Sequence, residues 1–340
     1  MFSRPKKITQ GDVARRASVS QATVSHVLNS STAISVPEET RQRVLQAINE
    51  LGYVPDRFAR SLRTRKTMTI ASVIPDIANP FYPQFMRGIQ DVVEQSGYDL
   101  ITYNTDGAHE KEQKALRALM QGRVDGAIMV LFHLTARELR PLLENDVAVV
   151  RLESRSKSIG ELPLDNIYVD SIAASRAAVR HLIAQGHTRI GMIAGQTGPR
   201  NDRMRGYEQA LAEHNIALDS ELIHSGDRFI ETSGYTGMRE FLTLPHRPTA
   251  VFAANDLIAM GALLALYEAR LRVPQEMAVI GFDDIPAAKL MNPPLTTVSQ
   301  FQEKLGRRAA EMLLERLTGR MSGPGRDVEM PFTLMTRESA

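Results

Sequence analysis

The sequence predicts a small all-α head followed by a larger α/β core of two doubly wound lobes. Residues 12–51 carry apolar side chains at helical spacing. From Met68 onward, short β-branched runs alternate with helical stretches, a pattern typical of parallel sheets covered by helices. Residues 1–66 hold 12 Lys and Arg against 5 Asp and Glu, a net +7, whereas the remainder holds 29 against 34, a net −5. This asymmetry indicates a polyanionic partner for the head alone.

The overall composition excludes several classes of protein. With 340 residues, 43% hydrophobic and 24% charged, the chain has the values of a globular protein of about two domains rather than a disordered or fibrous one. The absence of cysteine excludes disulfides and thiolate metal sites. The basic start has no apolar segment behind it, and no later stretch is long enough to span a bilayer. We therefore expect a cytoplasmic protein with no membrane partner.

Residues 12–29 predict two short helices joined by a tight turn. A break falls near residues 18–20, and Ser20 suits the N-cap of the second helix because its hydroxyl can accept from exposed amides. The two apolar faces consist of Val13, Ala14 and Ala17 in the first helix and of Val24, Val27 and Leu28 in the second.

The outer face of the second helix is suited to reading DNA. It presents Gln21, Ala22, Ser25 and His26, short polar or small side chains that can reach base edges in a major groove. On spacing alone, a pair of helices that merely caps a globular domain is an equal alternative. A third helix at residues 40–51 and an arginine-rich segment at 57–66 favour a helix-turn-helix head.

At this point the sequence resembles the LacI/GalR family of bacterial transcription regulators. The similar segments are Asp12-Val-Ala, Val19-Ser20, Ala22-Thr-Val-Ser, Val27-Leu-Asn29, Val36-Pro-Glu-Glu-Thr-Arg41, Glu50-Leu-Gly-Tyr53, Ala59-Arg-Ser-Leu-Arg63, Asp76-Ile-Ala-Asn-Pro-Phe81, Gly281-Phe-Asp-Asp284, Pro294-Leu-Thr-Thr297 and Arg337-Glu-Ser. The resemblance covers nearly the whole chain. It implies a periplasmic-binding-protein-like core and a regulator that binds double-stranded operator DNA as a homodimer under the control of a small-molecule effector.

Two head residues depart from the family pattern. Ser18 stands where the family usually has glycine, and a left-handed backbone there costs serine about 1 kcal/mol. His26 stands where arginine is common, so the base preference of other family members does not carry over.

Residues 55–67 form the expected link between head and core. A helix of roughly eight residues is too short to be stable alone, so it forms only against a surface. The resemblance implies a hinge helix that folds on DNA, with Leu62 wedged into the minor groove. The alternative is an exposed basic linker with one incidental leucine. The expected DNA-contacting residues of head and hinge together are Thr9, Ser20, Gln21, Ala22, Thr23, Ser25, His26, Asn29, Tyr53, Arg57, Ala59, Arg60, Leu62 and Arg63.

The boundaries that we expect are residues 1–54 for the helix-turn-helix domain, 55–67 for the hinge helix and 68–340 for the effector-binding and dimerisation core. The resemblance implies three crossings between lobes, with the first lobe at about 68–166 and 296–329 and the second at about 167–295 and 330–340. A strand near 167–169 thus opens the second lobe, and one at 297–300 returns to the first. No heptad tail follows the last strand, which favours a dimer.

Two lobes side by side make a cleft where the carboxyl ends of their strands present ligand-binding loops. The resemblance implies an effector site formed by Asp76, Phe81, Tyr82, Asp170, Arg203, Phe229, Asn255 and Asp283. Arginine, asparagine and aspartate can bind adjacent hydroxyls or an amide edge, and aromatic rings can cover an apolar ring face. That chemistry fits a sugar, a polyol or a nucleobase. Helix-start packing is an equal alternative for Phe81 and Tyr82.

Two other classes of protein fit the sequence less well. The sequence does not support an enzyme, because it contains no phosphate loop, no Gly-x-Ser-x-Gly motif and no metal-ligand spacing among the histidines. We expect no catalytic residue, no metal and no cofactor. A free-standing sugar receptor of the transport type has the same core. We expect such a receptor to begin with a secretory leader, whereas this sequence begins with a basic head.

Overall fold

The computed structural model describes residues 8–29, 36–54, 66–156 and 160–340. The chain divides into two compact units, residues 1–67 and residues 68–340. The head contains α1 (Gln10–Ala17), α2 (Gln21–Asn29) and α3 (Glu38–Leu51). Val13, Val24 and Val44, one from each helix, are completely buried in its small core.

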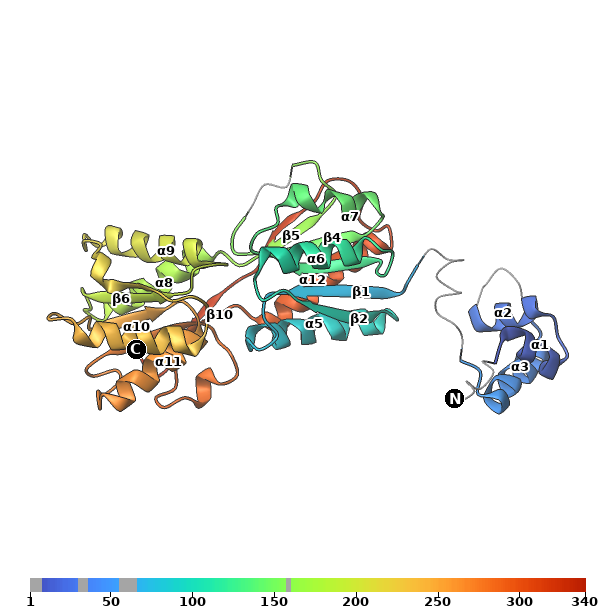
Figure 1. Cartoon of the computed structure of the whole chain (residues 1–340), viewed down its shortest axis with the longest axis horizontal. Helices are drawn as coiled ribbons and strands as arrows, with labels where there is room; N and C mark the ends of the chain where they lie inside the picture. Colours follow the sequence, from blue (N-terminus) through green and yellow to red (C-terminus); the bar gives the residue numbers. More distant parts are fainter. Residues whose placement is uncertain (1–7, 30–35, 55–65, 157–159) are drawn as a thin grey trace. The chain divides into compact units, whose positions relative to one another are not determined.

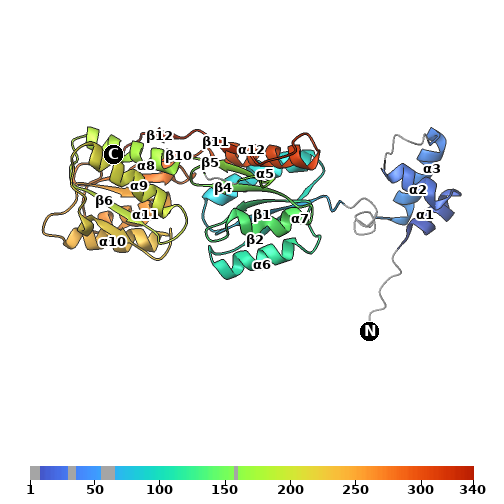
Figure 2. The same cartoon turned by 90° about the horizontal axis from the view of Figure 1, so that it is seen from above.

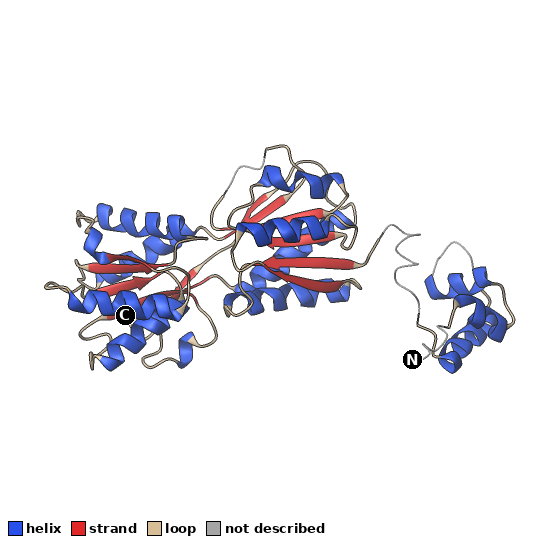
Figure 3. Cartoon of the chain, viewed as in Figure 1, coloured by secondary structure: helices blue, strands red, loops and turns tan. Residues whose placement is uncertain are grey.

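The core unit is built from two lobes, each with a central six-stranded sheet between helices (Figure 1, Figure 3). In the first lobe the strand order is β11-β5-β4-β3-β1-β2, and every pairing is parallel. Its strands are β1 (Thr69–Ile74), β2 (Asp99–Asn104), β3 (Gly126–Val130), β4 (Ala148–Glu153), β5 (Asp165–Tyr168) and β11 (Asp327–Glu329). All five residues of β3 are buried, as expected for a parallel strand covered on both faces.

The helices of the first lobe lie on both faces of its sheet (Figure 2). They are α5 (Phe81–Gln95), α6 (His109–Leu119), η1 (Ala136–Leu139), α7 (Arg140–Glu144) and α12 (Gln302–Leu317). The backbones of α5 and α12 approach closely at two glycines. A Cβ on Gly88 would lie 2.0 Å from the Glu303 carbonyl oxygen, and one on Gly306 would lie 2.0 Å from that of Phe85.

The second lobe has the order β12-β10-β9-β8-β6-β7, and only the β10–β12 pairing is antiparallel. Its strands are β6 (Ile190–Ala194), β7 (Ile223–Ser225), β8 (Ala250–Ala253), β9 (Ala278–Asp283), β10 (Thr296–Ser299) and β12 (Thr333–Met335). Its helices are α8 (Ser171–Ala184), α9 (Arg200–Glu213), η2 (Ser220–Leu222), α10 (Glu231–Thr243), α11 (Asp256–Glu268) and η3 (Ala288–Leu290). Its buried apolar residues form one continuous core.

The chain crosses between the lobes three times, as expected. The sequence prediction, however, placed each of the first two crossings one strand too early. The strand near residues 167–169 does not open the second lobe: β5 pairs with β4 and β11 in the first sheet. The strand at 297–300 does not return to the first lobe, because β10 pairs with β9 in the second. Burial explains both corrections, since Ile167 packs in the core of the first lobe and Val298 in that of the second.

Candidate ligand pocket and nucleic-acid interface

The turn between α1 and α2 has the geometry that the sequence predicts. Ser18 caps α1 with a left-handed backbone, φ 54° and ψ 47°. The Ser20 hydroxyl accepts a hydrogen bond from the Thr23 amide at 3.0 Å and so caps α2. Both expectations are confirmed. The turn therefore fixes the orientation of α2 on α1.

The exposed face of α2 is small and polar. Gln21 and Ala22 are exposed, and Ser25 and His26 are partly exposed. The Thr23 hydroxyl lies 2.9 Å from that of Ser20. These side chains lie on one side of the helix.

Two other residues that the sequence predicts to contact DNA stabilise the fold of the head. Thr9 caps α1, because its hydroxyl accepts a hydrogen bond from the Asp12 amide at 3.3 Å. Tyr53 is only 8% exposed and packs in the core of the head. DNA contact by either residue stays a prediction. Asn29 ends α2, but its side chain is outside the described part, as are Arg57, Ala59, Arg60, Leu62 and Arg63.

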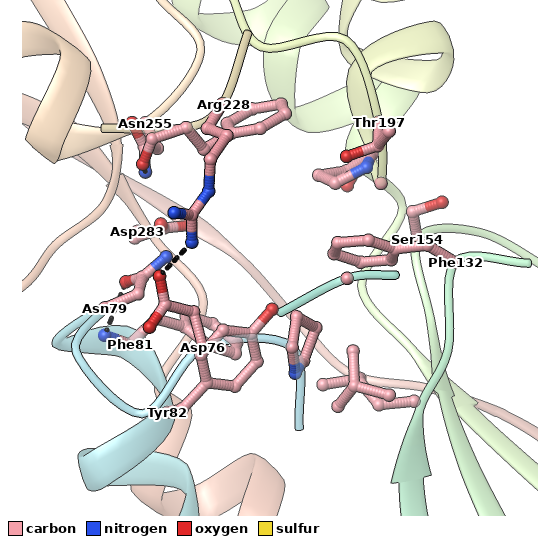
Figure 4. Close-up of a pocket in the computed structure, with 18 of the residues that line it drawn as sticks. Asp76, Asn79, Phe81, Tyr82, Phe132, Ser154, Thr197, Arg228, Asn255 and Asp283 are labelled. Carbon is pink, nitrogen blue, oxygen red and sulfur yellow. Dashed lines mark hydrogen bonds and ion pairs between the residues drawn. The ribbon is translucent and has the colours of Figure 1, made fainter. Parts of the chain in front are cut away.

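A pocket in the core unit lies where the two lobes face each other (Figure 4). It is bordered by loops that follow the carboxyl ends of parallel strands, such as the loop after β1 at Asp76 and the end of β9 at Asp283. Of the predicted effector residues, the structure brings Asp76, Phe81, Tyr82, Arg203, Phe229, Asn255 and Asp283 to this pocket. Asp170 does not line it, because its carboxylate caps α8 by accepting from the amides of Ile172 and Ala173.

Arg203 and Asp283 form a buried ion pair at the pocket wall. The two side chains are 6% and 5% exposed, and Nη2 of Arg203 lies 3.3 Å from Oδ1 of Asp283. Gln300 donates to the same oxygen at 2.7 Å. The guanidinium stacks on Phe282, with its carbon 3.8 Å from the ring centre, and also donates to the Ala254 carbonyl. These contacts fix the arginine in one orientation, which is what a preorganised ligand site requires.

Burial raises the pKa of the Asp283 carboxyl to about 6, although Arg203 and the hydrogen bond from Gln300 act in the opposite direction. The backbone of Asp283 has φ 113°, a strained value for a residue other than glycine. Backbone strain of this kind tends to occur at binding sites, where the surrounding structure holds it.

Asn255 links the pocket to the start of α11. Its Oδ1 accepts from the Ile258 amide at 2.9 Å, and its Nδ2 donates to the Phe229 carbonyl at 3.2 Å. The residue is 1% exposed. It therefore holds the loop that carries Phe229 against the helix that starts at the pocket.

Phe81 and Tyr82 begin α5 and line the pocket in the first lobe. Their rings meet edge to face, with centroids 5.2 Å apart. Burial, with a smaller contribution from the charge of Asp283, raises the pKa of the Tyr82 hydroxyl, so this group remains a neutral donor. The two rings are both packed and pocket-facing, so helix-start packing and ligand contact are compatible.

Sequence reasoning missed several lining residues, including Asp106, Phe132, Glu153, Ser154, Arg228 and Gln300. Arg228 reaches across the pocket and donates to Asp76 at 2.8 Å (Figure 4). Phe132 lies two residues beyond the end of β3, so the rule that ligands bind at the carboxyl ends of strands could have found it. Arg228 lies in a loop with no regular spacing, and only the fold brings it to the pocket.

Phe132 is positioned by a buried carboxylate on α6. Glu112 is fully buried and accepts from the amides of Phe132, His133 and Leu134 at 2.7, 3.1 and 3.0 Å. A Cβ on Gly198, in the second lobe, would lie 2.8 Å from the Phe132 ring. The aromatic ring therefore closes against the opposite lobe, and Glu112 fixes the backbone from which it projects.

Within the described ranges, no group of three or more His, Asp or Glu side chains could hold a metal ion. No helix in the same ranges is long and apolar enough to cross a bilayer.

A helix-turn-helix head joined to a two-lobed α/β core with an interlobe pocket defines the class of ligand-responsive DNA-binding regulators. Residues 9–56 match the family described as bacterial regulatory proteins, lacI family, and residues 179–340 match the periplasmic binding protein-like domain. The chain belongs to the LacI family of bacterial regulatory proteins. It is a DNA-binding regulator and not an enzyme.

Two curated relatives align over most of their length. The chain is 38% identical to the ribose operon repressor of Escherichia coli K12 over 314 residues, which cover 91% of this chain and 93% of the relative. It is 41% identical to the HTH-type transcriptional regulator RegA of Clostridium saccharobutylicum over 309 residues, 90% and 91% of the two chains.

Two solved structures share the fold at somewhat lower identity. The Lac repressor dimer bound to operator and the anti-inducer ONPF matches with a TM-score of 0.85 and 27% identity, covering 98% of this chain and 99% of that one. A LacI family regulator from Enterococcus faecium with bound ribose matches with a TM-score of 0.72 and 28% identity, covering 80% and 98%.

Proposed function

We propose that the chain is a cytoplasmic, homodimeric repressor that binds a near-palindromic operator and responds to a small polar metabolite in the interlobe pocket. The observation that carries the proposal is the presence, on one chain, of a small polar helix face in the head and a preorganised Arg203–Asp283 pocket in the core. Neither feature alone distinguishes a regulator from a simple DNA-binding or sugar-binding protein.

The DNA-binding part of the proposal places α2 in the major groove. Gln21 suits adenine, and His26 can donate to guanine acceptors. Lysines and arginines of the head, which has a net charge of +7, hold the phosphates. If about six phosphates are neutralised, the logarithm of affinity falls with the logarithm of salt at a slope of roughly −5. A flat salt response would contradict this part.

The effector part assigns a sugar, polyol or related ring compound to the pocket. Arg203, Asn255 and Asp283 supply charged and amide groups that pair with hydroxyls, and Phe81 and Phe229 supply apolar surface for a ring face. The relative that is a ribose operon repressor and the related structure with bound ribose support this chemistry.

The dimer part rests on apolar surface in the second lobe. Leu264 and Tyr267 lie three residues apart on α11 and are 52% and 80% exposed. Such a pair is costly to leave in water and suits burial against a second copy of the chain. The related Lac repressor structure is a dimer bound to operator, which supports the same arrangement.

The switch that we propose is a change in the angle between the lobes when the pocket fills, which decides whether the two hinge segments can pair on DNA. Coupling of about 1 to 3 kcal/mol is typical of allosteric proteins and changes affinity roughly 5- to 150-fold. An effector with equal affinity for both lobe angles changes nothing, so contacts from both lobes are required.

The test is to incubate the purified chain with sheared DNA of its own genome at physiological salt, recover the bound fragments and sequence them. Enrichment of a short palindrome supports a sequence-specific dimer, and the neighbouring genes nominate compounds for titration against the recovered site. Uniform recovery that vanishes as salt is raised would contradict operator recognition.

A further inference from the structure

We propose that the pocket takes an uncharged polar ring compound and rejects its phosphate ester. The inference rests on the proposed function, since it names the class of effector that the same pocket binds. The inference depends on which charged groups of the pocket already form ion pairs.

The pocket is lined by more acidic than basic groups. Its four carboxyl groups belong to Asp76, Asp106, Glu153 and Asp283, and its two cationic groups belong to Arg203 and Arg228. The formal charge of the lining is therefore −2. A phosphate ester carries close to two negative charges near neutral pH, so its binding depends on whether the cations near these carboxyl groups are free to compensate it.

Both lining arginines already have an acidic partner. Arg203 pairs with Asp283 at 3.3 Å, and Arg228 pairs with Asp76 at 2.8 Å. A phosphate that took over the paired nitrogen of either arginine would leave a carboxylate without its cation.

The two remaining carboxylates are paired with cations outside the lining. Glu153 is bound by Arg151 in a pair whose side chains are 3% and 6% exposed, and Asp106 is bound by Lys111. With these partners the set is neutral. An uncharged ligand leaves the balance intact, whereas a phosphate adds an uncompensated charge in a partly dehydrated site.

Helix N-termini often bind phosphate through free amides, and three of those at this pocket already have a side-chain acceptor. At the start of α5, Asn79 Oδ1 accepts from the Phe81 amide at 3.0 Å. The first amides of α8 are capped by Asp170, and the start of α11 is capped by Asn255.

Two further helices that begin at the pocket, α10 and α9, have no side-chain cap but carry an acid in the first turn, Glu231 in α10 and Asp202 in α9. Asp202 binds Ser154 and the Arg155 guanidinium, the latter at 3.0 Å. Its negative charge faces the same end of the helix that a phosphate would use.

Arg228 is the only lining cation with substantial exposure, 51% of its side chain, and it could swing toward a ligand. That movement leaves Asp76 unpaired, with Asp106 also within the electrostatic influence of Arg228. A phosphate placed there gains Arg228 but faces the unpaired Asp76 carboxylate, beside Asp106 and its partner Lys111, which is unfavourable.

The experiment is calorimetric titration of the full chain, in a phosphate-free buffer, with matched pairs of compounds. The pairs are ribose and ribose 5-phosphate, glucose and glucose 6-phosphate, and a purine nucleoside and its 5′-monophosphate. For any pair in which binding is detected, we expect the uncharged compound to bind at least about 100-fold more tightly. An ester that binds as tightly as its parent overturns the inference and leaves the proposed function standing.

A charge variant tests the cause. Asp106→Asn releases Lys111 and lowers the acidity of the rim, so the affinity of the ester relative to its parent should rise about tenfold. Asp146→Asn is the matched control, because it removes the same charge from an exposed site that does not line the pocket. Equal changes in both variants overturn the inference. If no compound binds and none alters DNA retention, the effector assignment itself fails, and the inference fails with it.

Discussion

The carboxylate of Asp76 in the first lobe accepts a hydrogen bond from the guanidinium of Arg228 in the second lobe, with 2.8 Å between the two atoms. A second link between the lobes joins Ser154 to Asp202. The side chains of Arg228 and Asp76 remain 51% and 25% exposed, so their pairing is worth only about 0 to 1 kcal/mol. Lobe closure is thus held in part by contacts that the binding energy of a small ligand can outweigh.

A double-mutant cycle of Asp76→Ala and Arg228→Ala should give a coupling free energy of about 0.2 to 1 kcal/mol in urea unfolding of the core. The coupling should shrink between 0.05 and about 0.5 M salt, because exposed charges are screened. A coupling above about 2 kcal/mol that is insensitive to salt would contradict the assignment of this pair as a weak, solvent-screened link.

Arg203→Ala should abolish the effector response while operator binding persists, because Arg203 lies in the core and not in the head. The variant leaves Asp283 buried without its cation, which costs about 3 to 5 kcal/mol of core stability. Adding Asp283→Asn should recover part of that loss without restoring the response. The measurements are operator affinity with and without effector and the unfolding midpoint of each variant. Loss of DNA binding in a folded Arg203→Ala protein would remove this residue from the effector site.

Asp283 should make the core more stable as the pH falls from 7 to 5. Its folded pKa, about 6, is raised above the ordinary 3.8, so in this window the folded protein takes up a proton that the unfolded chain does not. Stability from this group is therefore gained below pH 6 and lost as the pH rises through 6. The check is the unfolding free energy of the wild type minus that of Asp283→Asn across this range. This difference should become more positive as the pH falls. A pH-independent difference would show that Asp283 does not titrate there.

Glu112→Gln should weaken effector binding without changing the affinity for DNA at zero effector. The amide that replaces one carboxylate oxygen cannot accept from the backbone, so at least one of the three amide hydrogen bonds is lost and Phe132 is released. We expect a stability loss of about 1 to 3 kcal/mol, followed by thermal unfolding of the core. Glu110→Gln, at an exposed position on the same helix, is the control and should change neither quantity. Equal effects at both positions would argue against the positioning role.

Ser18→Gly should stabilise the head by about 0.5 to 1 kcal/mol, because glycine adopts the left-handed backbone at this turn without the penalty that serine bears. Gly52→Ala provides the mirror experiment: it places a Cβ at φ 61°, where no neighbouring atom lies within 4 Å, so its cost is backbone strain alone. Amide hydrogen exchange of α1 and α3 in the full chain measures both. The same sign for the two substitutions would be inconsistent with this account.

The sequence alone was sufficient for the elements whose signals are local. The turn at Ser18 and the cap at Ser20 follow from the short-range chemistry of one helix pair, and the buried strands follow from their short apolar runs. The lobe membership of β5 and β10 could not be predicted in this way. Both are short buried strands of similar composition, and only their neighbours in the sheet decide which lobe each one joins.

The pocket residues also differ in whether a local sequence signal identifies them. Residues in matched segments, such as Arg203 and Asp283, were assigned correctly to the pocket wall, although their role in binding stays a prediction. Asp170 was misassigned because a carboxylate before a helix can serve either a ligand or the helix itself, and here it caps α8. Arg228 was missed because its partner, Asp76, lies 152 residues away in sequence and no local pattern links the two.

The repeated crossing between lobes also determines the order in which the protein can assemble during its synthesis. Asp165 is fully buried, yet the arginines that bind it, Arg316 and Arg326, are made 151 and 161 residues later. At 5 to 20 residues per second, the nascent first lobe waits about 8 to 30 seconds for α12, with the facing surface of α5 uncovered. During this interval the uncovered apolar surface of α5 is a binding site for a chaperone.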